Sequence, residues 1–478
     1  MNLQLYNDMS GGKEPFEPLE PGVVSFYTCG PTVYDYFHIG NARPFIVFDS
    51  LRRYLESIGF RVNFVQNFTD IDDKMIHRAH QLGITVGELA DRFIEAYYED
   101  ADALGIRRAT RNPRATEEIP AIIDQIGLLI ERGHAYEADG DVYFEVSTFP
   151  RYGRLSKQNL DDLNSGARVE VDERKRHPLD FALWKAQKPG EPAWESPWGS
   201  GRPGWHIECS AMAKHYLGET IDIHGGGSDL IFPHHENEVA QSECAHGKTF
   251  ARFWIHNGYL MVDREKMSKS LGNFFTVRDV RAKYPTPVIR LFMLSAHYRS
   301  PINFSEETLE QARSAYERLR NGWAEISYAL SSRPCDVVPC SPDEDLRTAL
   351  SEARSLFGES MDDDFNTAGA IGAIFDLIRA TNISLARHGG IDFGAVEEAA
   401  SFLRAADDVL GIIQIESIEC SRNHDSEAEE INALIDEREG ARKRKDFARS
   451  DEIRKILGER GVILEDTPQG TRWKRSEA

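Results

Sequence analysis

An early strand, helix and strand pattern is the feature that most restricts the fold of this chain. A short β-prone run at 23–27 ends in a turn-rich segment, and apolar residues then recur at helical spacing over 41–58. A second strand is expected at 62–65. Such a βαβ unit predicts an α/β domain with a doubly wound parallel sheet, Rossmann-like in type. Ligands of these sheets bind beyond the carboxyl ends of the strands, which is where residues 29–41 fall.

The length of 478 residues is too great for one compact core and suggests three or four units. The βαβ rhythm lapses into irregular, Trp- and Pro-containing sequence after residue 118, a strand-like run returns at 221–224, and helical spacing begins near residue 305. We therefore divide the chain into a catalytic domain in two halves, 1–118 and 201–255, a connective insertion, 119–200, a junction domain, 256–304, a helical bundle, 305–415, and a linker with a small basic C-terminal domain, 416–478.

Composition narrows the class of protein further. The net charge of −22 argues against a protein that coats nucleic acid without specificity, but residues 441–478 carry 11 lysines and arginines against 7 acidic residues. This tail is a candidate RNA contact, or else a solvated helix face. The six cysteines are too sparse for a disulfide framework, and the N-terminus lacks the features of a signal peptide. No apolar run reaches the ~18 residues that span a bilayer. We expect a cytoplasmic protein without a membrane segment.

Two segments have the character of phosphate-binding sites. His38-Ile39-Gly40-Asn41 lies between a strand and a helix start, where backbone N–H groups and the helix dipole favour an anion, and Gly40 allows close approach. Lys266-Met267-Ser268-Lys269-Ser270 is a polar loop whose lysines can close over a triphosphate. Each segment alone could be an ordinary turn or a solvated loop. The two together, in this order, are far more specific.

A metal site can be proposed from residue types and spacing. His234 and Glu238 are four residues apart on an expected helix, so their side chains leave the same face. Cys29 and Cys209 belong to the predicted active-site edge, and two thiolates with an imidazole and a carboxylate suit Zn²⁺. His235 could replace His234, and buried cysteines are usually inert core residues. The sequence therefore leaves the ligand set open at this point.

The chain resembles cysteinyl-tRNA synthetases over nearly its whole length. Five segments carry the resemblance: 29–41, 67–74, 204–210, 224–238 and 266–270. Asn41 departs from the final histidine of the general class I tetrapeptide, although asparagine is usual in this family. The resemblance implies activation of L-cysteine with ATP to cysteinyl-adenylate, and transfer to the 3′ end of tRNA(Cys) with release of AMP and pyrophosphate. It also implies a monomer, tRNA binding by the bundle, and anticodon binding by the C-terminal domain.

The resemblance further implies roles for individual residues. Zinc would be held by Cys29, Cys209, His234 and Glu238, and would select the thiol of cysteine, so that no editing domain is needed. Mg²⁺ would accompany ATP. The remaining roles are catalysis by His38, Lys266 and Lys269; ATP binding by His38, Gly40, Asn41, Gly225, Gly226, Gly227, Asp229 and Lys269; and cysteine binding by Trp205 and His224.

Three other functions compete with this interpretation. A related cysteine-activating ligase of mycothiol synthesis lacks an anticodon-reading tail, whereas 362–367, 443–448 and 470–473 resemble the tRNA synthetase. An inactive, zinc-stabilised RNA-binding protein would have no reason to retain His38, Lys266 and Lys269. A Walker-type ATPase is disfavoured because Ser242 stands where the first glycine of the phosphate loop belongs.

Overall fold

A computed structural model describes the chain except for residues 1, 160–173, 263–264, 267–274, 334–341, 388–389, 416–425, 468–469 and 476–478. The catalytic domain is built on a parallel four-stranded sheet of order β10-β9-β3-β4. Its strands are β3 (Val23–Thr28), β4 (Arg61–Gln66), β9 (Ile221–Gly227) and β10 (Ala251–Asn257). The helix α1 (Ile39–Ser57) joins β3 to β4. The predicted α/β fold with a parallel sheet is confirmed.

Further helices surround this sheet. They are α2 (Asp73–Leu82), α3 (Val86–Ala103), α6 (Trp205–Leu217) and α7 (Glu236–His246). A short hairpin of β1 (Gln4–Asn7) and β2 (Gly12–Pro15) contacts the edge strand β10. The core beneath α1 includes edge-to-face aromatic pairs in which Phe26 contacts both Phe48 and Phe64.

The insertion between the two halves of the sheet is more regular than the sequence suggested. After α4 (Ile119–Glu131) it forms an antiparallel sheet, β5-β6-β7-β8. Its strands are β5 (Ala135–Ala138), β6 (Asp141–Phe144), β7 (Phe181–Ala186) and β8 (Gly201–Pro203). Strands of three to six residues are too short to show a clear alternation, which is why the sequence analysis did not detect this sheet.

A three-stranded sheet of order β12-β11-β13 forms the junction after β10. It consists of β11 (Leu260–Val262), β12 (Glu265–Lys266) and β13 (Ile302–Phe304), with α8 (Val277–Arg281) and α9 (Thr286–Leu294) between the last two strands. The helix α9 packs against both α1 and the first bundle helix, α10. The junction therefore touches the catalytic helix and the bundle at once.

The bundle contains α10 (Glu306–Ser331), α11 (Glu344–Asp362), α12 (Thr367–Leu385) and α13 (Phe393–Leu410). Ser305 caps α10, as the sequence predicts, by accepting a hydrogen bond from the backbone N–H of Thr308. By length and composition α12 is apolar enough to cross a membrane, although Asp376 and Arg379 interrupt its apolar sequence. Its apolar side chains pack against the other three bundle helices, as expected of a core helix.

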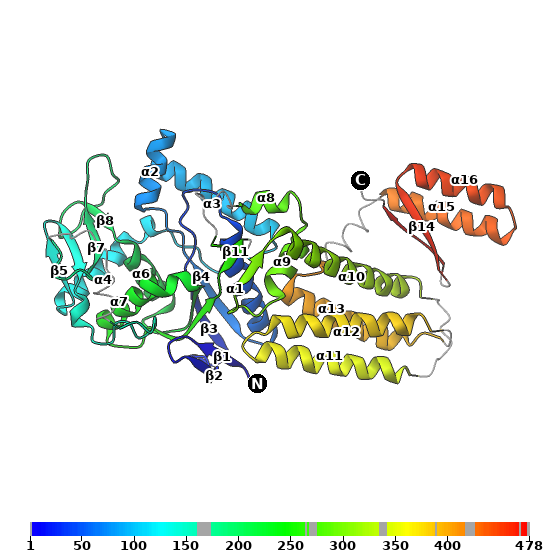
Figure 1. The fold of residues 1–478 in the computed structure, drawn as a ribbon, viewed down its shortest axis with the longest axis horizontal. Helices are drawn as coiled ribbons and strands as arrows, with labels where there is room; N and C mark the ends of the chain where they lie inside the picture. The colour runs from blue at the N-terminus through cyan, green and yellow to red at the C-terminus, as the bar shows by residue number, and fades with distance from the viewer. Residues whose placement is uncertain are drawn as a thin grey trace.

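The C-terminal unit lies beyond α10 at one end of an elongated molecule, and the insertion lies at the other (Figure 1). It is made of α15 (Ser426–Lys443), α16 (Phe447–Glu459) and a hairpin of β14 (Val462–Thr467) and β15 (Gly470–Arg475). This unit has its own small core, separate from the main one. That core consists of Ile431, Ile435, Ile453, Leu457 and Val462.

Candidate active site and metal centre

Four side chains from distant parts of the sequence meet at the carboxyl edge of the parallel sheet. Cys29, Cys209, His234 and Glu238 place one potential ligand atom each within 4.8 Å of one another. The Cys29 sulfur lies 3.6 Å from that of Cys209 and 3.4 Å from Oε1 of Glu238. Nε2 of His234 lies 3.1 Å from the same carboxylate oxygen. These are the four residues that the resemblance implies.

Local structure explains how each ligand reaches the cluster. Cys29 directly follows β3, and its backbone N–H donates to the carbonyl of Gly225 on the neighbouring strand at 3.3 Å. The next residue must be glycine, because a Cβ at Gly30 would lie 1.6 Å from the carbonyl oxygen of Asn67. Cys209 lies in the second turn of α6 and is buried.

His234 and Glu238 do not share one regular helix, contrary to the sequence expectation. His234 belongs to a π-helical turn, η4 (Ile231–His235), and Glu238 lies in the first turn of α7. Phe232, two residues before His234, has extended backbone dihedrals and marks a kink within this turn. A π turn at a binding site is a common arrangement, and here it still leaves the two side chains in contact.

A second set of potential ligands overlaps the first and includes His235, the alternative histidine. Cys29 and Glu238 also lie within 4.8 Å of His224 and His235. Nε2 of His235 is 3.3 Å from the Cys29 sulfur, while its Nδ1 is hydrogen bonded to His256 at 2.7 Å. Geometry alone therefore supports a metal at this cluster without choosing between the two histidines.

Charge interactions distinguish the two histidines. Burial lowers the pKa of His235 well below its usual range, and the neighbouring histidines lower it further. Burial also opposes charge on His234, but the carboxylate of Glu238 and the thiol of Cys209 outweigh it and raise the pKa of His234 to about 10. Without a metal, His234 thus holds a proton that a bound metal ion would have to displace, whereas His235 is already neutral.

Two of the three acidic ligands, Glu238 and Cys209, are shifted toward ionisation, whereas burial and the neighbouring Cys209 raise the pKa of Cys29 well above its usual range. Burial raises the pKa of Glu238, but His224 and His234 outweigh this effect and hold it at about 2. The pKa of Cys209 falls to about 7, mainly because the Cys29 thiol donates to its sulfur. A carboxylate and a thiol that ionise this readily are suitable metal ligands, because a metal binds their deprotonated forms.

Further histidines support the cluster, and two of them, His206 and His256, were not selected by the sequence analysis. Nδ1 of His206 lies 2.9 Å from Nδ1 of His234, and Nε2 of His224 lies 2.8 Å from Oε2 of Glu238. The hydrogen bond from His235 to His256 continues at 2.7 Å to Asp8, in the turn after β1. His206 stands within a segment that matches the family and could have been singled out. Asp8 has no local signal, because it lies 248 residues from His256.

The predicted cysteine-pocket residues lie at this cluster. Trp205 is the first residue of α6; its ring centroid is 4.4 Å from that of His234, and 39% of the residue is exposed. Trp205 therefore lies against the cluster and is partly exposed to solvent. His224 is fully buried in β9 and stacks on Trp254. The contact of His224 with Glu238 makes it a support for a ligand rather than part of an exposed pocket surface.

The first phosphate-binding segment forms the start of α1. His38 is the N-cap residue, and its Nδ1 accepts from the backbone N–H of Asn41 at 3.2 Å. Gly40 and Asn41 occupy the first helical turn and are half-buried. The helix starts two residues before the position suggested by the apolar spacing, because capping by His38 defines its beginning. The positive dipole end of α1 is at this turn, although the N–H groups of Ile39 and Asn41 already donate to Phe275 and His38.

The second segment is attached close to the first at both ends. Lys266 ends β12, which pairs with β11, and Thr276, just after the loop, forms a β-bridge with His38. The backbone N–H of Ile39 donates to the carbonyl of Phe275 at 3.0 Å. The Lys266 side chain and all of Lys269 lie outside the described residues, so their predicted roles remain predictions.

A buried arginine two residues after Asn41 ties these segments together. The guanidinium of Arg43 donates to five backbone carbonyls, which belong to Gly258, Tyr259, His297, Tyr298 and Ser300. Burial lowers its pKa to about 10. Gly258 and Tyr259 immediately precede β11, so Arg43 fixes the base of the lysine-bearing strand pair against the first turns of α1.

The glycine turn at the end of β9 has a packing function. A Cβ at Gly225 would lie 2.9 Å from the ring of Phe48, and one at Gly226 would lie 2.5 Å from the ring of His235. At Gly227 the obstacle would be the Asp229 carboxylate, at 2.3 Å. The first two glycines are therefore required inside the protein. Their predicted role in ATP binding, and that of the exposed Asp229, remain predictions.

Comparison with known proteins matches three family models along the chain. Residues 15–314, well over half of the chain, match the catalytic domain of class I (C) tRNA synthetases. Residues 356–414 match the DALR domain, and residues 424–473 match the cysteinyl-tRNA ligase anticodon binding domain. The last match covers the basic tail that the sequence proposed as an RNA contact.

Solved structures share the fold at low sequence identity. Methionyl-tRNA synthetase of Mycobacterium tuberculosis, in complex with methionyl-adenylate, is 16% identical, with a TM-score of 0.59 over 82% of this chain and 90% of that chain. The agnB2 LeuRS of Agrobacterium radiobacter K84, in a ternary complex with tRNA and LeuAMS, is 11% identical, with a TM-score of 0.62 over 83% and 85%. The chain therefore belongs to the cysteinyl-tRNA synthetase family of class I aminoacyl-tRNA synthetases, ATP-dependent ligases that join an amino acid to tRNA.

Proposed function

We propose that this ligase selects L-cysteine through a zinc ion held by Cys29, Cys209, His234 and Glu238. The observation that carries the proposal is the convergence of these four ligand atoms within 4.8 Å at the carboxyl edge of the sheet. Ligands at ~2.0–2.3 Å from a common ion lie within about 4.6 Å of one another, so these side chains fit zinc after only small adjustments.

The donor set and its surroundings fit zinc in other respects as well. Two sulfurs, one imidazole nitrogen and one carboxylate oxygen suit this ion better than the hard cations Mg²⁺ and Ca²⁺. His206 and His224 hydrogen bond to the outer atoms of His234 and Glu238 and would hold both ligands in orientation. Zinc at this site would bind the thiolate of cysteine directly, whereas serine has only a poorly acidic hydroxyl and alanine has no donor.

The remaining residues would position ATP and stabilise charge. His38 and the positive end of the α1 dipole would receive the phosphates of ATP, which arrives with Mg²⁺. Lys266 and Lys269 would neutralise the charge that develops on pyrophosphate as the cysteine carboxylate attacks the α-phosphate in line. Trp205 would enclose the cysteine side chain. Catalysis would then rest mainly on orientation and electrostatic stabilisation.

The second step would transfer the cysteinyl group to the terminal ribose of tRNA(Cys) and release AMP. The anticodon-binding match at 424–473 supports tRNA as the acceptor and disfavours an amino-sugar acceptor, for which such a domain has no use. We further propose a monomeric, cytoplasmic enzyme, since the sparse cysteines suit a reducing compartment. Sedimentation and cell fractionation test these two points.

Pyrophosphate exchange across all amino acids, with zinc quantified in the same preparation, tests this function. We expect about one zinc per chain and exchange with cysteine but not with serine. Cys209→Ser should lose zinc and cysteine-dependent exchange. Cys244→Ser is the matched control, because Cys244 is also a buried free thiol and lies on α7, the helix of Glu238, but outside the cluster. Equal exchange with serine and cysteine would refute selection by the metal.

The same measurements separate the competing functions. A zinc-containing protein that exchanges pyrophosphate with no amino acid would be an inactive RNA-binding relative. Exchange with cysteine but transfer only to an amino sugar, and never to tRNA, would identify the ligase of mycothiol synthesis.

A further inference from the structure

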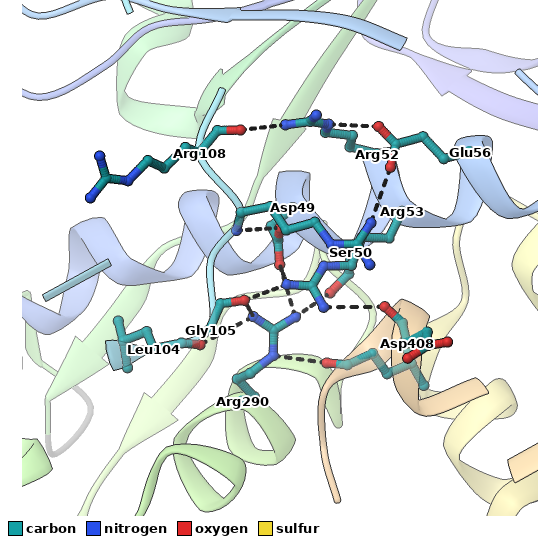
Figure 2. Close-up of polar contacts among 12 residues, drawn as sticks. Asp49, Ser50, Arg52, Arg53, Glu56, Leu104, Gly105, Arg108, Arg290 and Asp408 are labelled. Atoms are coloured by element: carbon teal, nitrogen blue, oxygen red, sulfur yellow. Dashed lines mark hydrogen bonds and ion pairs between the residues drawn. The ribbon is translucent and has the colours of Figure 1, made fainter. Parts of the chain in front are cut away.

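Arg290, in the middle of α9, is a fully buried arginine placed where three parts of the molecule meet (Figure 2). Its Nη2 donates to the carboxylate of Asp49 at 3.0 Å and to the hydroxyl of Ser50 at 3.1 Å, both on α1. Its Nε donates to the carbonyl of Leu410, the last residue of α13, at 2.8 Å. The guanidinium therefore joins the catalytic helix to the end of the bundle.

The remaining donors of Arg290 reach the end of a third element. Its Nη1 donates to the carbonyls of Leu104 and Gly105, both at 3.3 Å, where α3 ends. Arg53, one turn along α1 from Asp49, donates to Gly105 as well and to the carbonyl of Asp408 at 3.1 Å. It also pairs with Asp49 at 2.9 Å. We call Arg290, Arg53 and Asp49 the arginine joint.

The arginine joint holds two arginines and one carboxylate, and further negative charge lies around it. The C-terminal ends of α3 and α13 each carry the equivalent of about half a negative charge. The carboxylate of Asp407 also attracts Arg290. The two guanidinium groups are therefore held by Asp49, by Asp407 and by the carbonyls at the ends of α3 and α13.

Close packing leaves the joint little freedom. Gly411 caps α13 with φ +64°, and a Cβ there would lie 2.7 Å from Nε of Arg290. On the following residues, the backbone N–H groups of Ile413 and Ile415 donate to the Asp407 carboxylate at 2.7 and 2.8 Å. The chain is thus held from Arg290 to the last residues before 416–425, which lead to the anticodon-binding unit.

The position of the joint matters because the bundle is long, so a small tilt at its base produces a larger displacement at its far end. The 26-residue helix α10 is about 39 Å long, so a tilt of about 5° at its base displaces the far end by about 3 Å. A misplacement of about 1 Å at the reacting groups can cost about 100-fold in rate. From Asp49 to the N-cap His38 the rigid helix α1 spans only about 16 Å.

We propose that the arginine joint positions the bundle relative to the helix that presents His38, and that aminoacyl transfer to tRNA depends on it while adenylate formation does not. Adenylate formation uses groups of the catalytic domain and the lysine loop. Transfer additionally requires that a tRNA bound along the bundle and the C-terminal unit brings its 3′ end to the same site. Arg290 is therefore a positioning residue for the second step. This inference rests on the proposed function.

Arg290→Lys tests the proposal, since lysine keeps the charge but loses the planar fork of donors that reaches three elements. Single-turnover transfer from preformed adenylate to tRNA should slow by 10-fold or more, while cysteine-dependent pyrophosphate exchange changes by less than 3-fold. Arg53→Lys is the second variant, in case Arg290→Lys does not fold, and should show the same split. Thermal unfolding of each full-length variant confirms that assays are run on folded protein.

Arg347→Lys is the matched control. Arg347 forms a forked pair with Asp392 at 2.9 and 3.2 Å, but joins two bundle helices away from the joint, and its replacement should leave both steps unchanged within 3-fold. Equal losses in exchange and transfer, or no loss in transfer, for both joint variants would overturn the inference. A wild-type enzyme that exchanges with cysteine but charges no tRNA would instead refute the proposed function.

Discussion

At Gly226 the space that a side chain would need is already occupied by the ring of His235. His235 in turn contacts the thiol of Cys29 and the imidazole of His256. The family resemblance implies that this glycine takes part in ATP binding, but the structure gives it a packing reason that does not involve ATP. Single residues at this site therefore act through their neighbours in the metal cluster.

Gly226→Ala should lower the free energy of unfolding by about 1–3 kcal/mol, the usual cost of overpacking a core. It should also reduce zinc content and cysteine exchange, because the new methyl group displaces His235 from Cys29. Denaturant unfolding, metal analysis and exchange kinetics measure these effects. A rise in KM for ATP alone, with zinc content and stability unchanged, would instead support the predicted role of Gly226 in ATP binding.

Gly372→Ala is the control for this substitution. Gly372 lies inside α12, and a Cβ there meets no atom within 4 Å. Replacing a helical glycine of this kind with alanine should raise stability by about 0.5–1 kcal/mol and leave exchange unaffected.

Helix ends in the bundle show how one side chain organises an element. Asp343 caps α11 by accepting from the backbone N–H of Leu346 at 3.1 Å, and it also accepts from the hydroxyl of Ser384 at 2.6 Å. The hydrogen bond from Ser384 is the largest cause of the lowered pKa of Asp343. Asp392 caps α13 in the same way, and hydrogen bonds outweigh the effect of burial and lower its pKa too.

Asp343→Ala should cost about 1 kcal/mol of stability at pH 7, as loss of an N-cap typically does. Because the folded pKa lies below the unfolded value of 3.8, the ionic contribution is present above that pH and is lost as the pH falls through the folded pKa. The difference between wild type and variant should therefore be smaller at pH 3 than at pH 7 in denaturant unfolding. A difference that grows on acidification would contradict this account.

Asp376→Ala is the matched control at the scale of the helix. Asp376 is exposed and pairs only with Arg379, three residues along α12, among the contacts that the structure describes. Its replacement should change stability by less than about 0.5 kcal/mol at either pH.

The whole molecule separates the adenylate chemistry from anticodon recognition. The catalytic sheet and the C-terminal unit lie in different parts of an elongated molecule, and the latter has a core of its own (Figure 1). The main core includes the sheet, the junction and the bundle as one cluster. The C-terminal unit should thus be removable without unfolding the rest.

Deletion of residues 424–478 should leave cysteine-dependent pyrophosphate exchange within about 3-fold of the full-length value. Charging of tRNA(Cys) should fall by 10-fold or more, because the anticodon contacts are lost. Exchange and charging assays on the two proteins at matched concentration test this expectation. Unchanged charging would remove the tail from the RNA interface.

The sequence by itself determined whatever depends on neighbours along the chain. The spacing of apolar residues predicted the βαβ unit and the first bundle helix, and motif resemblance predicted the family, its ligase activity and four residues that the structure brings together as a possible metal site. The sequence alone contains these signals because helices, caps and motifs depend on residues that are close together along the chain. The short strands of the insertion and the π turn before α7 were not predicted, since they are too brief to show a period.

Only the tertiary structure decided which distant residues support the site. Asp8 reaches His256 across 248 residues, Arg290 reaches Asp49 across 241, and Arg43 holds carbonyls more than 200 residues away. A buried arginine or histidine leaves no periodic signal, because its partners are set by the packing of whole elements. The chemistry could be read from the sequence, but the framework that holds it in place arises from long-range packing.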